Sequence, residues 1–209
     1  MQALSEKLPS RREQQKEARR NAIIDAGFQE FALQGFTATK LDDVAVRAGI
    51  GKGTIYLYFD SKESLFEEVI RKNMFPARDE AVLHAAEFQG TATELLEIHF
   101  NRSYAFLHQE KMPQIVALVM GEASHFPKIA DFFFKEIVSS SQELVRNIIK
   151  KGVASGEFRA DAPIDFTQIL IAPAMISAIW RLQFDEHSPL DMEKYAKAHL
   201  EFVLRGLKP

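Results

Sequence analysis

Apolar residues recur at helical spacing along most of the chain, and no stretch alternates apolar and polar residues as a strand would. The pattern predicts a helix over residues 20–34, ended by Gly35, and two short helices between residues 39 and 59. Another helix begins after Asp60, and Pro76 is expected to kink or end it. Beyond it we expect helices near residues 78–88, 93–109, 113–123, 126–154, 164–184 and 190–206. The predicted fold class is therefore all-α.

The stretch from Thr39 to Lys62 places two short helices around a glycine turn. Thr39 and Asp42 have capping-box spacing, and Gly49 tolerates the left-handed conformation that ends many helices. The segment after Gly49 is too short to be stable as an isolated helix. The major groove of DNA is a sufficient partner for it. The pattern indicates a helix-turn-helix over about residues 39–58.

Small, cationic and hydroxyl side chains in this stretch suit contact with DNA. Glycines allow close backbone approach, Lys52 neutralises phosphate or reaches a guanine edge, and phenol groups suit phosphate oxygens. Asp60 and Glu63 repeat the capping spacing, so Lys62 lies in the first turn of a helix, where a nearby anion explains it better than helix stability does. For each residue alone, a core aromatic or a solvated lysine is the competing interpretation. The predicted DNA-binding residues are Thr39, Lys40, Gly51, Lys52, Gly53, Thr54, Tyr56, Tyr58 and Lys62.

These residues resemble the N-terminal signature of the TetR family of transcriptional regulators. The resemblance covers about residues 20–65 and implies a three-helix DNA-binding domain, here residues 18–64, followed by a larger helical domain, residues 65–209, for ligand binding and dimerisation. Many relatives carry Ser before the Lys, whereas this chain has Gly51, which can cap a helix but offers no side chain to phosphate. The matching positions are Gly35, Thr39, Val44-Ala45, Ala48-Gly49-Ile50, Lys52-Gly53-Thr54-Ile55-Tyr56, Tyr58-Phe59, Ser61-Lys62-Glu63 and Leu65.

Composition adds several exclusions. The 209 residues are 46% hydrophobic and 26% charged, which is ordinary for a globular protein with a real core. The absence of cysteine excludes disulfides and thiolate metal sites, and the six histidines show no metal-binding spacing, so we expect no metal and no cofactor. No apolar run approaches the ~20 residues of a membrane helix. We expect a cytoplasmic protein that does not contact a membrane.

The net charge of −3 is unevenly distributed. Up to residue 60 there are nine Lys or Arg against eight Asp or Glu, whereas the remainder is acidic. A mildly basic head on an acidic body suits a protein that touches DNA at one end. Residues 1–17 are predicted to be a flexible basic arm that lies along phosphates or enters the minor groove, and a solubilising tail is the alternative. The basic run within and after it is Arg11, Arg12, Lys16, Arg19 and Arg20.

Aromatic and methionine residues in the second half suggest a cavity between helices. A pocket also needs a few placed polar groups, which His99 and Tyr104 can supply. Ordinary core packing is the competing interpretation for each residue. The predicted pocket residues for a small apolar or aromatic ligand are His99, Phe100, Tyr104, Met120, Phe133 and Trp180.

The last two long helices each carry a broad apolar face. The family resemblance implies that they pair with their copies in a four-helix interface, and a two-fold dimer can read two DNA half-sites spaced by multiples of ~34–36 Å. We therefore expect a homodimer on a palindromic operator. The predicted interface residues are Phe166, Leu170, Ser177, Phe184, Tyr195, His199 and Phe202.

Three classes of function are compared on these observations. A repressor released from double-stranded DNA by a small ligand is favoured by the motif and the family resemblance, with an activator of the same family as the alternative. A DNA-binding assembly protein whose body binds a protein partner also fits the sequence. No nucleophile, metal or phosphate-loop motif is found, so an enzyme is not expected.

Overall fold

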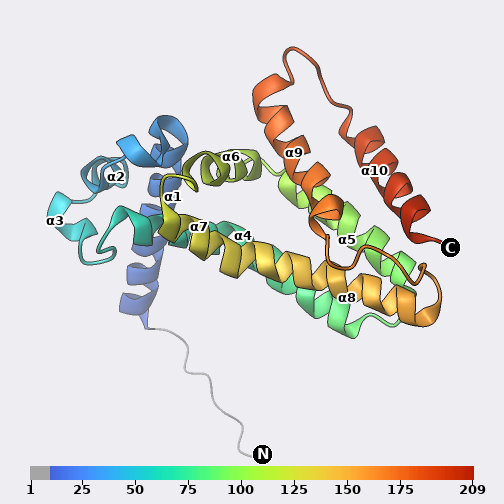
Figure 1. Ribbon diagram of the computed structural model, residues 1–209. Coiled ribbons are helices and arrows are strands. Elements are labelled where there is room, and N and C mark those ends of the chain that lie inside the picture. The colour runs from blue at the N-terminus through green and yellow to red at the C-terminus, as the bar shows by residue number, and fades with distance from the viewer. Residues whose placement is uncertain (1–9) are drawn as a thin grey trace, which may run out of the picture. The chain divides into compact units, whose positions relative to one another are not determined.

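The computed structural model describes residues 10–209, and these residues form helices joined by short loops, with no strand among them (Figure 1). The all-α prediction is confirmed. They group into two compact units that divide inside α4: the head, Met1–Val69, and the body, Ile70–Pro209. The elements are α1 (Arg11–Ala38), α2 (Leu41–Arg47), α3 (Lys52–Ile55), α4 (Lys62–Glu87), α5 (Ala92–Leu107), α6 (Met112–Glu122), α7 (Pro127–Phe133), the π-helical segment η1 (Phe134–Val138), α8 (Ser139–Ser155), α9 (Gln168–Phe184) and α10 (Met192–Leu207).

The core of the head is built around three phenylalanines. Phe31 and Phe36 from α1 stack with ring centroids 5.6 Å apart, and Phe66 from α4 meets each of them edge-on at 5.3 Å. These edge-to-face and stacked pairs add to the burial of three large side chains. Gly27 lets α4 approach α1, because a Cβ there would lie 2.8 Å from Leu65 Cδ2. The aromatic cluster thus joins the first turns of α4 to α1.

Helix α2 ends as its glycine predicts. Gly49 has a φ of +67°, its N–H donates to Val46 O (3.1 Å), and the N–H of Ile50 donates to Ala45 O (3.0 Å). This pair of hydrogen bonds is the Schellman arrangement, which satisfies carbonyls left free at a helix end. The turn between α2 and α3 is therefore set by backbone chemistry.

Three predicted helix starts are wrong by position. α1 begins at Arg11, because Ser10 and Glu13 form a capping box, so the basic residues from Arg11 to Lys16 lie on a helix and the predicted flexible arm is wrong for this part. The rest of that arm, residues 1–9, lies outside the described residues. The cap of α2 is Lys40, not Thr39, and has no side-chain hydrogen bond. Helix α4 is capped by Ser61, whose hydroxyl accepts from the N–H of Ser64 (3.1 Å), not by Asp60 with Glu63.

Pro76 does not end α4, which continues to Glu87 and includes the separate helix expected near residues 78–88. A proline inside a helix costs about 3 kcal/mol. Buried side chains ahead of it, such as Val69 and Met74, and the packing of Ala85 after it favour the helix on both sides. Tertiary packing therefore overrides the local signal.

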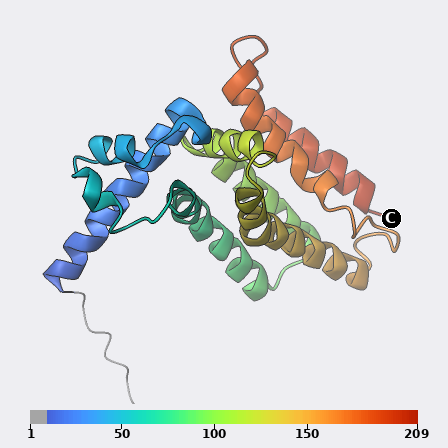
Figure 2. The ribbon, with the colours of Figure 1, turned by 60° about the vertical axis from the view of Figure 1, so that its left-hand side comes forward.

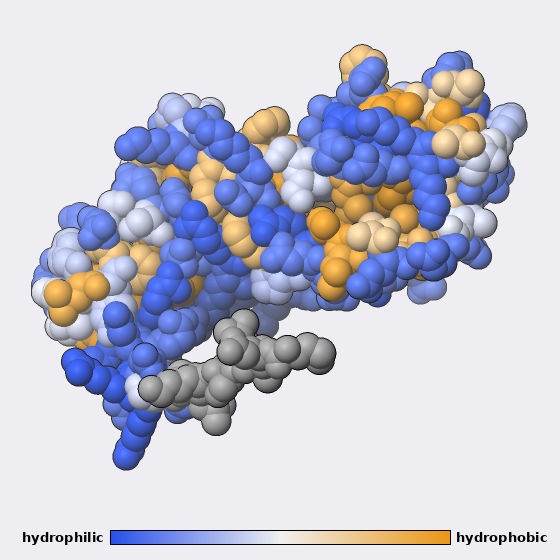
Figure 3. Space-filling view, turned by 90° about the horizontal axis from the view of Figure 1, so that it is seen from below, coloured by the Kyte–Doolittle hydropathy of each residue, from blue (hydrophilic) through white to orange (hydrophobic). Residues whose placement is uncertain are grey.

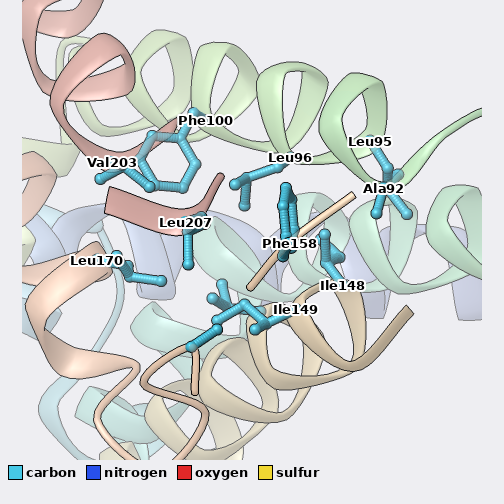
Figure 4. Close-up of a cluster of buried hydrophobic side chains, with 12 residues drawn as sticks. Ala92, Leu95, Leu96, Phe100, Ile148, Ile149, Phe158, Leu170, Val203 and Leu207 are labelled. Atoms are coloured by element: carbon cyan, nitrogen blue, oxygen red, sulfur yellow. The ribbon is translucent and has the colours of Figure 1, made fainter. Parts of the chain in front are cut away.

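The centre of the body is an apolar cluster between α5, α8, α9 and α10 (Figure 4). Phe158, from the loop after α8, inserts its ring into this cluster among Leu96, Ile148 and Ile149. Gly152 makes room for that ring on α8, since a Cβ there would lie 2.1 Å from Phe158 Cδ2. The loop is held by the N–H of Phe158, which donates to Gly152 O (3.0 Å).

The same loop caps α5. The carboxylate of Glu157 accepts from the backbone N–H of Ala92 (3.0 Å) and of Thr93 (2.9 Å). Burial raises the pKa of this carboxyl, but the hydrogen bonds from Ala92, Thr93 and Ser155 outweigh that effect and lower the pKa to about 2. A negative charge at a helix N-terminus also suits the helix dipole.

The single helix expected over residues 126–154 is instead α7, η1 and α8 in direct succession. In the π-helical turn of η1, hydrogen bonds span five residues where those of an α-helix span four, and such turns are rare. It is supported from α4, since Arg78 Nη1 donates to Glu136 O (2.9 Å) and lies 3.3 Å from Glu136 Oε2.

Gly152→Ala is expected to destabilise the protein by about 1–3 kcal/mol, because the added methyl overpacks against Phe158. Thermal or chemical denaturation measures the change. Gly121→Ala is the matched control, since a Cβ at Gly121 meets nothing within 4 Å and alanine there gains up to about 1 kcal/mol of helix propensity. Equal stability of the two variants would contradict this packing.

Candidate functional site

The predicted DNA-binding residues lie around the turn between α2 and α3, and most reach solvent. Lys40, Gly51, Lys52, Gly53 and Tyr56 are exposed. Thr54 and Tyr58 are half-buried. Gly51 is the N-cap of α3 and has no side-chain hydrogen bond to offer, as its sequence position suggested. The arrangement presents backbone, a cation and phenols on one short segment.

Lys52 makes an ion pair on this surface. Its Nζ lies 2.8 Å from Asp42 Oδ2, and this hydrogen bond with Asp42 raises the pKa of the lysine. Exposed ion pairs contribute little to stability, so phosphate can displace the carboxylate at low cost. The pairing keeps Lys52 charged and oriented across the α2–α3 turn.

Thr39, which was predicted to contact DNA, is buried in the head. It is 2% exposed, and its hydroxyl donates to Gly35 O (2.7 Å), with Glu30 O 3.2 Å away. Gly35 has a φ of +78° and breaks the helical backbone of α1. The threonine therefore satisfies carbonyls at this break, a role that its spacing to Asp42 concealed.

Lys62 is also occupied within the head. Its Nζ donates to Phe36 O and Thr37 O, both at 2.9 Å, and lies 4.6 Å from the centroid of the Phe36 ring. Carbonyls at a helix C-terminus lack intrahelical partners and carry partial negative charge, which a cation stabilises. The carbonyls at the end of α1 thus supply a negative partner for Lys62, and its contact with DNA phosphate stays a prediction.

Arg20 from the basic run serves a similar purpose. It forms an ion pair with Glu68 of α4, and its guanidinium lies 5.7 Å from the Phe59 ring centroid. This contact and Lys62 both hold the first turns of α4 to α1.

Two exposed apolar residues close in sequence to the α2–α3 turn were not assigned a role from sequence. Leu57 is 81% exposed and Val46 is 69% exposed. Ile55 and Phe59 are buried four residues apart, so Leu57 between them points outward. That spacing was the available signal. Apolar side chains beside a recognition helix can contact thymine methyl groups.

The body contains a cavity of about 490 Å³. Four of the six predicted pocket residues line it: His99, Phe100, Tyr104 and Phe133. Met120 does not, because it is 56% exposed on α6. Trp180 does not either, since it is on the surface and its Nε1 donates to Ser188 O (2.8 Å). Wall residues that sequence reasoning missed come from α4 and from the π-helical region, namely Met74, Arg78, Ala81, Ile137, Val138, Ser140 and Ser141.

The charged residues on the cavity wall are already paired. Arg78 contacts Asp79 (2.7 Å) and Glu136 (3.3 Å), and Arg102 contacts Glu80 (3.4 Å). His99 is uncharged near neutral pH, because burial lowers its pKa to about 4. The wall is therefore mostly apolar and offers no uncompensated cation among the lining residues.

A polar network joins the cavity wall to α9 and α10. Tyr104 OH lies 2.9 Å from His199 Nδ1, and His108 Nε2 lies 3.0 Å from Ser177 Oγ. Burial raises the pKa of Tyr104 and lowers those of His108 and His199, so the network is neutral at ordinary pH. Ser177 is 0% exposed and Leu170 is 5% exposed. These two were predicted at a dimer interface but are buried within the subunit.

Other residues of α9 and α10 leave an apolar surface uncovered. These helices lie side by side (Figures 1 and 2). Tyr195 and His199 are half-buried, whereas three predicted interface residues are exposed: Phe166 (64%), Phe184 (44%) and Phe202 (80%). Ile169 (64%) and Ile176 (52%) add to this surface. Apolar side chains also reach the surface in patches among hydrophilic ones on the face seen in Figure 3.

The described residues contain no group of three or more side chains suited to a metal ion. No helix among them is long and apolar enough to cross a membrane.

A helix-turn-helix head joined to a helical body with an apolar cavity defines the class: DNA-binding transcriptional regulators. Comparison with known families gives the particular group. Residues 23–69 match the bacterial regulatory proteins of the tetR family, and residues 94–205 match the C-terminal domain of AefR-like transcriptional repressors. The chain belongs to the TetR family of transcriptional regulators.

Relatives and solved structures agree with this assignment. The HTH-type transcriptional repressor KstR2 of Rhodococcus jostii is 28% identical over 197 residues, which is 92% of each chain. The uncharacterized regulator YhgD of Bacillus subtilis is 28% identical and covers 90% of this chain and 96% of its own. The transcriptional regulator FadR of Bacillus subtilis, solved in complex with stearoyl-CoA, has the same fold with a TM-score of 0.75 at 20% identity, covering 90% of this chain and 98% of its own.

Lys52→Ala and Lys62→Met are expected to separate a DNA contact from a structural contact. Lys52→Ala should weaken operator binding and reduce the salt slope of the affinity by about 1 for each lysine removed, with stability unchanged. Lys62→Met should lower the free energy of unfolding by about 1–3 kcal/mol, because it removes charge-assisted hydrogen bonds to Phe36 and Thr37, and should leave the salt slope unchanged.

Binding titrations at several salt concentrations, beside denaturation curves, measure both effects. A reduced salt slope in Lys62→Met would show that Lys62 contacts phosphate as well.

Proposed function

We propose that this protein is a transcriptional repressor that binds a palindromic operator as a homodimer and leaves the DNA when a small apolar ligand occupies the body cavity. The observation that carries the proposal is that α4 extends from the head into the body. Its first turns are fixed to α1 by Lys62 and by the Arg20–Glu68 ion pair. Its later turns supply Met74, Arg78 and Ala81 to the cavity wall. One helix is thus part of both the DNA-binding unit and the ligand-binding unit.

The release step follows from this shared helix. A ligand that fits the cavity better when Arg78 and its neighbours are displaced shifts α4 and, with it, the head that the first turns of α4 contact. The ligand can shift the equilibrium between the DNA-bound and the released conformation only by the difference in its affinity for the two. When the two α3 helices of a dimer move apart, both can no longer lie in successive major grooves of the operator.

Relatives support an apolar ligand. FadR of Bacillus subtilis was solved with stearoyl-CoA, and KstR2 of Mycobacterium tuberculosis is described as a ketosteroid transcriptional regulator. Both descriptions name molecules with large apolar parts. The apolar wall around Phe100 and Phe133 suits such a molecule.

The dimer proposal rests on the uncovered face of α9 and α10. Isolated exposed apolar residues are common, but Ile169, Ile176 and Phe202 gather on neighbouring helices together with the small exposed residues Ala172 and Ala198, which allow close approach of a second copy.

Phe202→Glu is expected to convert the dimer into monomers, because a charge would be buried at the interface, and to reduce operator affinity at least tenfold. Sedimentation or light scattering measures the mass. Leu83→Glu, at a residue 59% exposed on α4, is the matched control and should remain dimeric. A dimeric Phe202→Glu protein would move the interface elsewhere.

A gel shift at fixed salt with DNA flanking the gene of this protein tests DNA binding, with wild type beside Tyr56→Ala. Tyr56 is 52% exposed at the end of α3, so the Tyr56→Ala variant should fold but should no longer shift the DNA. A promoter fusion then distinguishes repression from activation. A shift that no apolar compound reverses would favour a DNA-binding protein whose body binds another protein.

A further inference from the structure

Resting on the proposed function, we infer that the cavity ligand is an uncharged, largely apolar molecule whose carbonyl or hydroxyl oxygen hydrogen-bonds to the imidazole of His99. In this role His99 orients the ligand in the cavity. The uncharged oxygen also defines a chemical class of ligand, which neither the fold nor the family specifies.

His99, like His108 and His199, is half-buried, but it differs from them in its hydrogen bonds. His108 and His199 each have one ring nitrogen hydrogen-bonded, to Ser177 and to Tyr104. The ring of His99 has no hydrogen-bond partner in the part of the chain that the structure describes, and its nearest aromatic neighbour is Phe100, edge-on at 6.5 Å. Among the described residues, the buried side-chain atoms without a hydrogen-bond partner are His108 Nδ1, Thr167 Oγ1 and His199 Nε2, so the ring nitrogens of His99 are not sealed inside the protein. They are accessible in the wall of the cavity, where a ligand oxygen can hydrogen-bond to them.

His99 lies where a ligand in the cavity would contact it. It lies on α5 in the wall of the 490 Å³ cavity, together with Phe100 and Tyr104. Burial lowers the pKa of His99 to about 4, so the ring stays neutral while a ligand binds near pH 7. A neutral imidazole offers one N–H donor and one acceptor nitrogen, which suit a carbonyl or a hydroxyl group.

The charges of the wall argue against an anionic group inside the cavity. Arg78 is neutralised by Asp79 and Glu136, and Arg102 by Glu80. A carboxylate placed beside His99 would have to displace the acidic partners of Arg78 or Arg102 before either arginine could pair with it. An uncharged oxygen requires no such partner.

The test uses three naphthalenes of similar shape with the full-length protein: 2-acetylnaphthalene, 2-ethylnaphthalene and 2-naphthoate. Equilibrium dialysis at pH 7.5 should show that the ketone binds roughly fivefold more tightly than the ethyl compound, as one neutral hydrogen bond would give. The carboxylate should bind most weakly. Equal affinity for all three, no binding of the ketone, or tightest binding of the carboxylate would overturn the inference.

His99→Leu should remove the preference for the ketone, whereas His125→Leu, the same change at an exposed histidine outside the cavity, should keep it. A preference that survives His99→Leu, or that disappears in His125→Leu, would contradict the assignment of the oxygen to His99. If His99→Leu does not fold, the imidazole nitrogen resonances of the wild type provide the second measurement. They should shift with the ketone and not with 2-ethylnaphthalene, and identical shifts would contradict the contact.

Both measurements are made without DNA. Ligand chemistry and ligand-released repression can therefore fail separately. A ketone preference in a protein that no compound removes from the operator would leave the role of His99 intact and reject the release mechanism.

Discussion

Helix α3 is four residues long, and a helix of that length has no stability of its own in water. Its position depends on the elements around it. Ile55 and Phe59 anchor the segment in the head core, the Schellman turn at Gly49 fixes its entry, and the cluster of Phe31, Phe36 and Phe66 holds the helices beneath it. A protein that must present a short helix to DNA therefore needs a dense core close behind it. That core in turn binds the start of α4.

Much of the architecture could be predicted from the sequence, because its signals are local. Helical periodicity fixed the all-α class, and Gly49 marked the turn, since only a residue tolerant of positive φ fits there. The predicted helix boundaries were less accurate where neighbouring residues could each cap the same helix. Ser61 caps α4 although Asp60 has the same spacing to a polar residue, and Thr39 turns back to α1 although Asp42 follows it. Thr39 bonds to a carbonyl of α1, and the cap of α4 depends on where the chain turns into the helix. The sequence spacing between two polar residues indicates neither.

The candidate sites divide in the same way. Exposed residues of the helix-turn-helix could be predicted because the motif is short and dense. Lys62 could not, since its partners, the carbonyls of Phe36 and Thr37, are about twenty-five residues away in sequence. In the body, periodicity identified apolar faces but not which face meets a cavity. Phe133 lines the cavity and Trp180 does not, although both are aromatic residues on apolar helices, because helix packing and not composition decides which side chain is enclosed.

The π-helical segment η1 determines the register of α8. An α-helix advances by about 100° per residue. Deleting one residue of Phe134–Val138 to restore α-helical geometry would rotate every residue on one side relative to the other by about that angle. Ser140 and Ser141 of the cavity wall and Ile148 and Ile149 of the core share one helix, so their relation to α7 is set by this single additional residue. Length changes at this point offer evolution a way to redirect the lining of the cavity without altering any side chain of the core.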